Sequence, residues 1–266
     1  FNRMEDENIA QAIPNADSWD WFRDNAPRLD CPQDNFAEIF AYRWWTLRKH
    51  IRKTPVGFAF TEFLVDRSYA DQYNLISCAL GHHIHEARWL ADPHYLDQAV
   101  HVWYRGNEGG PMRKLRSFSS WTAAALWAKY QADGDREFLV DMLPDLVAEY
   151  RAWQEERGLP GGLFWQHDVK DGMEEQISGG RRVKNIRPTI NSYMYGNAVA
   201  LSEIARLAGE EALSSEFAAR AGELRVLVHG ILWNEERQFF ETVLEENGTH
   251  AGVREAIGFI PWYFHL

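Results

Sequence analysis

The chain is poor in cysteine, in basic residues and in long apolar runs, and each shortage excludes a class of protein. Only Cys31 and Cys78 occur among 266 residues, too few for a disulfide framework or a four-thiolate zinc site. The net charge is −11, whereas proteins that bind nucleic acid or an anionic membrane surface present an excess of basic residues. No apolar run approaches the roughly 20 residues of a membrane span. We therefore expect neither a nucleic-acid partner nor a membrane partner.

The first ten residues, FNRMEDENIA, contain no apolar signal-peptide core, and position 1 is Phe rather than Met. We therefore expect the true N-terminus to lie outside this chain. The compartment stays open, with the cytoplasm slightly favoured over secretion.

Aromatic residues are abundant, with 12 Trp, 10 Tyr and 15 Phe in a chain that is 45% hydrophobic. A sizeable core is therefore expected, and global disorder is not. The aromatics fit a large core, but they also fit a sugar-binding cleft, because flat apolar rings stack on the C–H faces of pyranosides. Composition alone leaves both interpretations open.

Apolar residues recur with helical spacing along most of the chain, whereas strand signals are scarce. We expect helices over 35–51, 75–91, 93–106, 117–135, 137–158, 191–209 and 211–233, and a short strand over 237–244. No linker or break in composition occurs, so we expect a single domain over 1–266. Paired helices that repeat about every 40–50 residues fit either a helical solenoid or a closed α/α toroid.

The helical pattern fails between Leu159 and Arg187. Long loops in compact helical domains are uncommon and often functional. This loop carries Asp168, Asp171, Glu174 and Glu175. A carboxyl group beside apolar rings can have its pKa raised, as general-acid catalysis requires. A solvated acidic surface loop explains the same residues, so the loop alone does not decide.

Two motifs in this region resemble a known family. DGMEEQISGG at 171–180, followed by RPTINSYMYGNAVAL at 187–201, is similar to the acid-bearing segment of the (α/α)6-toroid glycoside hydrolases. Trehalases, processing α-glucosidases and mannosylglycerate hydrolases share that segment. The mannosylglycerate hydrolase-like group resembles this chain most, because trehalase signatures are absent. The resemblance implies an all-α fold, the (α/α)6 toroid.

In those families a Gly–aromatic–Asp or Gly–Met–Asp stretch carries the general acid. Here Glu174 follows Gly172 and Met173, so the resemblance assigns the general acid to Glu174. Glutamate lengthens the arm by one methylene relative to aspartate, and Asp171 is therefore the reserve candidate. Asn191 falls where these families open the next helix with a sugar-contacting polar residue.

Other stretches agree with the resemblance, which covers most of 35–245. FAYRWWTLRKHI at 40–51, YNLISCALGHHIHEARWL at 73–90 and RSFSSWTAAALWAKY at 116–130 resemble the first three inner helices of the toroid. LWNEERQFFE at 232–241 resembles the turn and short strand after an outer helix. The further substrate-binding candidates are Arg43, Trp44, His82, His83, Trp121, Trp165, Arg187 and Tyr195.

Each of these candidates also has a plain structural interpretation. Trp44, Trp165 and Tyr195 fit core positions as well as stacking rings. His82 and His83 cannot point the same way, so at most one reaches a ligand directly. Arg187 could pair with Glu174 or Glu175, or bind an acidic aglycone.

A metal site is the weakest interpretation of GHHIHEARW. His82, His85 and Glu86 could share one helix face, but they do not form the two-histidine i, i+4 metalloprotease pattern. Neutral imidazoles that hydrogen-bond sugar hydroxyls rank first, and structural histidines second. We expect no metal and no organic cofactor.

The sequence thus predicts a glycoside hydrolase that cleaves an α-glucoside or α-mannoside with inversion. The alternatives are a non-catalytic helical-repeat protein that binds a glycan or peptide, and a toroid-type epimerase or phosphorylase. A six-hairpin toroid needs about twelve helices, and about seven are predicted here. We therefore expect a second chain, or a continuation of this one, to supply the remaining helices and the catalytic base.

Overall fold

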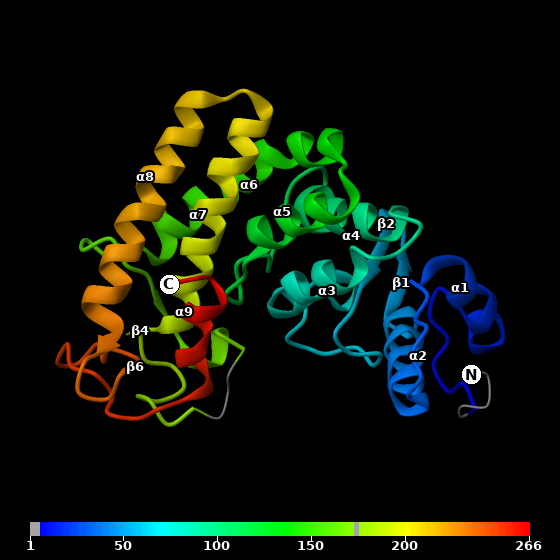
Figure 1. Cartoon of the computed structure of the whole chain (residues 1–266), viewed down its shortest axis with the longest axis horizontal. Helices are drawn as coiled ribbons and strands as arrows, with labels where there is room; N and C mark the ends of the chain where they lie inside the picture. The colour runs from blue at the N-terminus through cyan, green and yellow to red at the C-terminus, as the bar shows by residue number, and fades with distance from the viewer. Residues whose placement is uncertain (1–5, 173–175) are drawn as a thin grey trace. The chain divides into compact units, whose positions relative to one another are not determined.

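The computed structural model describes residues 6–172 and 176–266, and these divide into two compact units. The N-terminal unit ends at Leu115, and the C-terminal unit begins at Arg116. Figure 1 shows that helices dominate both units and that the strands are short. The single domain over 1–266 stays a prediction.

The N-terminal unit contains four α-helices, one β-hairpin and three short 3-10 turns among its described residues. In chain order they are η1 (Asn15–Asp17), α1 (Ser18–Asn25), α2 (Asp34–Lys49), β1 (Ile51–Thr54), β2 (Gly57–Phe60), η2 (Gln72–Asn74), η3 (Ser77–Ala79), α3 (Leu80–Ala87) and α4 (His94–Arg105). The hairpin packs on α4, and the amide of Phe58 donates to Gln98 Oε1 at 2.9 Å.

The hairpin follows α2 directly and was not predicted from the sequence. Its strands are antiparallel, with Ile51 opposite Phe60. The turn is stabilised locally, because the Thr54 hydroxyl donates to the Gly57 carbonyl at 2.7 Å and accepts from the Val56 amide at 3.2 Å. Gly57 has a φ of 135°, which favours glycine over residues with a side chain.

The C-terminal unit is built around α7 (Pro188–Ala208), which packs most extensively against three other helices and also contacts α9 (Ile260–Tyr263). The three helices are α5 (Thr122–Asp133), α6 (Arg136–Arg157) and α8 (Glu211–Leu227). The remaining elements are β3 (Trp165–Gln166), η4 (Asp168–Lys170), β4 (Asn185–Ile186), η5 (Val228–Leu232), β5 (Trp233–Asn234), β6 (Phe239–Phe240), η6 (Ala256–Phe259) and α9 (Ile260–Tyr263). Most of α7 is buried because its apolar side chains point to several neighbours at once, which places it at the centre of the core.

Local sequence signals fix the helix ends of this unit. Pro188 occupies the first turn of α7, where its missing N–H costs nothing. Gly134 and Gly209 end α5 and α7 in the left-handed conformation, with φ of 74° and 84°. The Asp135 side chain accepts from the Phe138 amide at 3.0 Å and caps α6.

Several predicted elements are shorter in the structure. The helix predicted over 75–91 is α-helical only from Leu80, because Tyr73 and Asn74 adopt positive φ and a 3-10 turn follows. The helix predicted over 117–135 begins at Thr122, and the strand predicted over 237–244 narrows to Phe239–Phe240. The helix over 211–233 ends at Leu227 and continues as the π-helical turn η5. None of the described helices combines the length and apolar character that a membrane span requires.

Candidate active site

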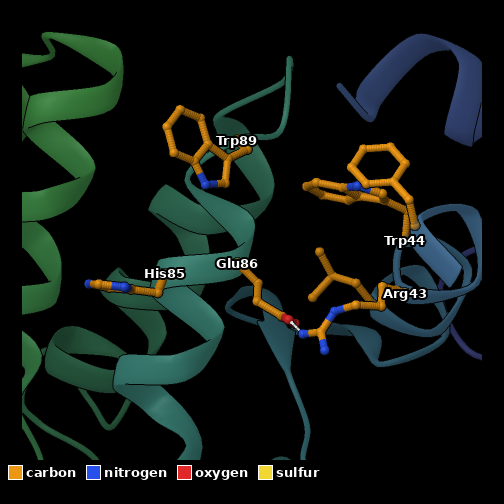
Figure 2. A pocket seen from close by; sticks show the side chains of 7 residues that line it. Arg43, Trp44, His85, Glu86 and Trp89 are labelled. Atoms are coloured by element: carbon orange, nitrogen blue, oxygen red, sulfur yellow. Dashed lines mark ion pairs between the residues drawn. The ribbon is translucent and has the colours of Figure 1, made fainter. Parts of the chain in front are cut away.

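A pocket of about 200 Å³ lies between α2 and α3 of the N-terminal unit. Two predicted substrate-binding residues, Arg43 and Trp44, line it. The full lining is Phe40, Arg43, Trp44, Leu47, His85, Glu86 and Trp89. Figure 2 shows Arg43 and Glu86 reaching toward each other across the pocket, where they form an ion pair. The pocket thus combines aromatic walls with one charged pair that offers donors and acceptors.

The three histidines of α3 differ in whether they line the pocket. His85 lines the pocket, whereas His82 and His83 are not among the lining residues. Burial lowers the pKa of His83 to about 3 and that of His85 to about 4, so both imidazoles are neutral at pH 7. The His83 ring packs 5.8 Å from that of Phe60 on the hairpin. Among the described residues, no group of His, Cys, Asp and Glu is arranged to hold a metal ion.

Sequence reasoning missed Phe40 and Trp89 in this pocket. Both could have been found from helical spacing, since Phe40 precedes Trp44 by four residues and Trp89 follows His85 by four. Residues that far apart share a helix face, so Phe40 and Trp44 mark the face of α2 that lines the pocket, whereas Trp89 lies in the turn after α3.

The predicted acid-bearing loop lies in the C-terminal unit. Glu174, the predicted general acid, lies outside the described residues together with Met173 and Glu175. The structure does describe both flanks of this segment. On one flank is Asp171, and on the other is Arg187, which immediately precedes α7.

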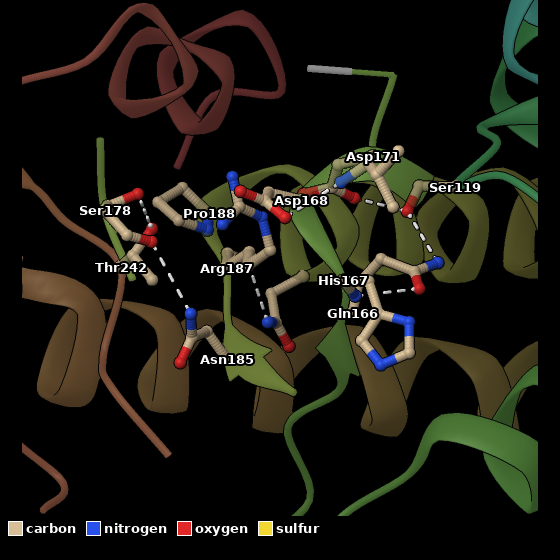
Figure 3. Close-up of polar contacts among 12 residues, drawn as sticks. Ser119, Gln166, His167, Asp168, Asp171, Ser178, Asn185, Arg187, Pro188 and Thr242 are labelled. Carbon is tan, nitrogen blue, oxygen red and sulfur yellow. Dashed lines mark hydrogen bonds and ion pairs between the residues drawn. The ribbon is translucent and has the colours of Figure 1, made fainter. Parts of the chain in front are cut away.

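Asp171 and Arg187 form a fully buried ion pair, with Nε to Oδ2 at 2.8 Å and neither side chain exposed. The Ser119 hydroxyl donates to the other carboxylate oxygen of Asp171, and Gln166 Nε2 donates to Ser119 at 3.3 Å (Figure 3). We call Asp171, Arg187, Ser119 and Gln166 the buried clamp. The sequence predicted Glu174 or Glu175 as partners of Arg187, and among the described residues its ion-pair partner is Asp171. The buried clamp therefore ties Asp171, in the middle of the loop, to Arg187 at its end.

Burial raises the pKa of Asp171, while the charge of Arg187 and hydrogen bonds from Ser119, Arg187 and Thr189 oppose the rise. A guanidinium does not lose its proton in proteins, so a neutral Asp171 would leave a buried cation unbalanced. The carboxylate of Asp171 is also shielded from solvent, because its side chain has no exposed surface. These contacts make Asp171 a structural anchor, and the assignment of the acid to Glu174 stays a prediction.

The second half of the loop is held against the segment that follows β6. The Glu245 amide donates to Asn185 Oδ1 at 3.0 Å, and the Ser178 hydroxyl donates to Thr242 Oγ1 at 3.2 Å. Ile186 and Val243 exchange backbone hydrogen bonds at 3.0 and 2.9 Å. Figure 3 shows Ser178, Asn185 and Thr242 side by side at this end of the loop. The loop is therefore anchored in its middle and in its second half.

Three other predicted residues of this unit are buried. The Asn191 side chain accepts from the Phe164 amide at 2.7 Å and donates to the carbonyls of Phe164 and Arg187, so it joins the loop to α7. Trp121 and Tyr195 are 5% and 9% exposed. The structure gives Asn191 and Trp121 packing or hydrogen-bonding contacts with protein, and contact of all three with a sugar stays a prediction.

Trp165 is half-buried, and cations lie near its ring. Arg157 Cζ is 4.5 Å and Lys184 Nζ is 4.7 Å from the ring centroid. Both distances are typical of cation–π contacts. A sugar that stacked on Trp165 would compete with these cations for the ring.

Comparison with known proteins identifies the family. The family model described as the mannosylglycerate hydrolase MGH1-like glycoside hydrolase domain matches residues 72–266. The chain belongs to this family. The match includes the whole acid-bearing loop and α3, but not α2.

Relatives with solved structures agree with this assignment. A chain named sialidase is 59% identical, with a TM-score of 0.96, and the similarity covers 99% of this chain and 24% of that one. The GH63 mannosylglycerate hydrolase from Thermus thermophilus in complex with glucose is 15% identical, with a TM-score of 0.62, over 78% of this chain and 68% of that one. These likenesses confirm the predicted family and the all-α fold class, with this chain carrying part of an (α/α)6 toroid.

A curated relative is an uncharacterized protein of Borreliella burgdorferi. It is 25% identical over 139 residues, which are 51% of this chain and 28% of that protein. The chain thus spans about a quarter of the length of this relative and of the sialidase-named chain.

Proposed function

We propose that this chain contributes the acid-bearing part of a glycoside hydrolase that cleaves an α-glucoside or α-mannoside with inversion. The observation that carries the proposal is the family match over 72–266, which contains the loop that the buried clamp holds. In an inverting enzyme one carboxylic acid protonates the leaving oxygen, and a carboxylate roughly 6.5–9.5 Å away activates water on the opposite face. Glu174 takes the acid role.

In this proposal the pocket between α2 and α3 binds one sugar ring. Its volume of about 200 Å³ lies below the roughly 300–1,000 Å³ of pockets that hold drug-sized ligands, which suits a single ring. Trp44 and Trp89 offer apolar faces to the C–H groups of a pyranose. Arg43 donates to sugar hydroxyls and Glu86 accepts from them.

The catalytic base comes from outside this chain. Two downstream carboxylates are already engaged with the loop, since Glu255 accepts from the Ile177 amide at 2.6 Å and Glu245 accepts from the Lys184 amide at 3.3 Å. Both carboxylates therefore already hold loop backbone in place, which gives each of them a structural role. A second chain or a continuation of this one supplies the base and the remaining helices.

A sialoside is a second candidate substrate. The observation that favours it is the 59% identity to the chain named sialidase. One assay compares the two candidates, because an aryl α-glucoside, an aryl α-mannoside and an aryl sialoside all release the same chromophore when they are cleaved. The substrate that releases the chromophore identifies the sugar.

The decisive variant is Glu174→Gln, tested in the complete enzyme that contains this chain. General acids contribute about 10²–10⁴-fold, so turnover of an alkyl glycoside is expected to fall by that factor. A glycosyl fluoride needs little protonation to leave, so its hydrolysis is expected to fall much less. Glu175→Gln is the matched control and is expected to retain most activity on both substrates. An equal loss on both substrates, or near-normal activity on the alkyl glycoside, removes Glu174 from the acid role and makes Asp171 the next candidate.

A further inference from the structure

The ribbon formed by β3 and β4 has two different faces. Trp165 pairs with Ile186 across the ribbon, and side chains alternate between the two faces of a strand. Gln166 is fully buried in the clamp, whereas its neighbours Trp165 and His167 are half-buried. The rings of Trp165 and His167 lie 5.2 Å apart, and so they share the face that points away from the buried clamp.

Two cations lie against the Trp165 ring on this outer face, and a third, Arg182, acts on His167 through its charge. The two are Arg157 and Lys184, which lie within 5 Å of the Trp165 ring centroid. We call Arg157, Arg182 and Lys184, with Trp165 and His167, the cationic cluster. Within the described part of the chain, none of the three cations forms an ion pair with a carboxylate, and Arg157 Nε is buried without a hydrogen-bond partner.

The nearest carboxylates are used elsewhere. Glu156, the neighbour of Arg157, pairs with Arg116 at 2.7 Å. Glu245 accepts from the backbone of Lys184 rather than from its ammonium group. Asp168 is fully buried and accepts from the Val169 amide at 2.9 Å. Asp168 is thus a negative charge near the cluster, since it acts on His167 and its Oδ2 has no hydrogen-bond partner, but among the described residues it forms no ion pair with any of the three cations.

The pKa of His167 is consistent with an excess of positive charge around it. Burial, then the charges of Arg157 and Lys184, lower its pKa, and Asp168 opposes them only in part. The imidazole is therefore neutral at pH 7 and can accept or donate a hydrogen bond beside the three cations.

We propose that the cationic cluster binds the carboxylate of an acidic sugar residue. The choice of a sugar as the carrier of the carboxylate rests on the proposed function. The Arg157 guanidinium offers paired donors that match a carboxylate, and Lys184, the residue before β4, adds a second charge. A neutral pyranose is disfavoured because the cations compete for the faces of Trp165. A polyanion such as nucleic acid is disfavoured by the net charge of −11.

The test compares D-glucuronate with D-glucose, which differ only in the carboxylate, by titration calorimetry and by NMR of the His167 ring. Glucuronate is expected to bind and to shift the His167 signals, whereas glucose does neither. Lys184→Gln removes one charged hydrogen bond to the carboxylate. We expect this loss to raise the dissociation constant for glucuronate about tenfold. Arg157→Met should do the same, and Arg157→Lys should weaken it less. Lys53→Gln, an exposed lysine of the N-terminal unit, is the control and should bind glucuronate normally.

Equal affinity for the two sugars, or unchanged binding in Lys184→Gln, overturns the proposal. Tighter binding of inorganic phosphate or of a short oligonucleotide than of glucuronate also overturns it, and assigns the cluster to general anion binding. Glu174→Gln separates this proposal from the proposed function, because it should abolish hydrolysis and leave glucuronate binding intact. Glucuronate binding without any glycosidase activity would refute only the proposed function.

Discussion

Replacing Asp171 by Asn removes the charge that balances the buried guanidinium of Arg187. Neither side chain of the pair is exposed, and Arg187 Nη1 and Nη2 have no hydrogen-bond partner among the described residues. The carboxylate of Asp171 is therefore the main compensation for a cation that stays charged at any accessible pH. Breaking a buried pair by removing one partner costs about 3–5 kcal/mol, because an uncompensated charge remains inside the protein. We expect Asp171→Asn to lower the free energy of unfolding by about that amount.

Equilibrium unfolding in urea measures this loss, and a double variant separates charge from packing. Replacing both partners by apolar residues, as Asp171→Leu with Arg187→Met, removes the unbalanced charge along with the pair. Such replacements are often close to neutral, so the double variant should lose less than the sum of the two single variants. The matched control is the exposed pair of Arg151 and Glu216, whose side chains are 56% and 54% exposed. Glu216→Gln should cost no more than about 1 kcal/mol.

Two results would refute the reasoning. If Asp171→Asn costs no more than Glu216→Gln, the pair is hydrated in solution and does not tie Asp171 to the end of the loop. If the double variant loses the full sum of the single variants, the side chains contribute through packing rather than through charge balance.

Individual contacts give three further predictions. His83 and His85 have pKa values of about 3 and 4 in the folded protein, whereas the unfolded chain titrates near 6.5, so stability is complete above pH 6.5 and falls as the pH drops toward 4. Urea unfolding at pH 7.5 and 4.5 should differ by on the order of 2–4 kcal/mol from this source, and replacing both histidines by Gln should flatten the difference. Asp135→Ala should cost about 1 kcal/mol by removing the cap of α6, with Asp135→Asn nearly neutral, and an equal cost for both variants would exclude the cap. Gly258→Ala should cost about 1–3 kcal/mol, because its Cβ meets the Phe239 ring and the Phe240 carbonyl, and an unchanged thermal midpoint would contradict that packing.

The helices that the sequence predicted well are those with a regular apolar face and clear end signals. α4, α6 and α7 lie within a few residues of their predicted bounds, since Pro93 and Gly106 mark the two ends of α4 and Gly209 marks the end of α7. The β1–β2 hairpin was missed because its four-residue strands are too short for a periodic pattern and are stabilised by packing on α4.

The candidate site was predictable in outline but not in its contacts. The break in helical periodicity located the loop, and the motif around Gly172 pointed to Glu174. The pairing of Asp171 with Arg187 could not be read from the sequence, because the residues are 16 positions apart and several carboxylates compete for the same cation. Only the folded backbone brings one of them to the guanidinium and buries both.

The central claim is that the loop after Asp171 carries the acid of an inverting α-glycosidase. Proton NMR of the first sugar released from an aryl α-glucoside or α-mannoside tests it most directly, using the complete enzyme that contains this chain. Inversion at the anomeric carbon predicts that the β-anomer appears first and that mutarotation then produces the α-anomer. Appearance of the α-anomer first, or the absence of release from every α-glycoside that the protein binds, would contradict the account.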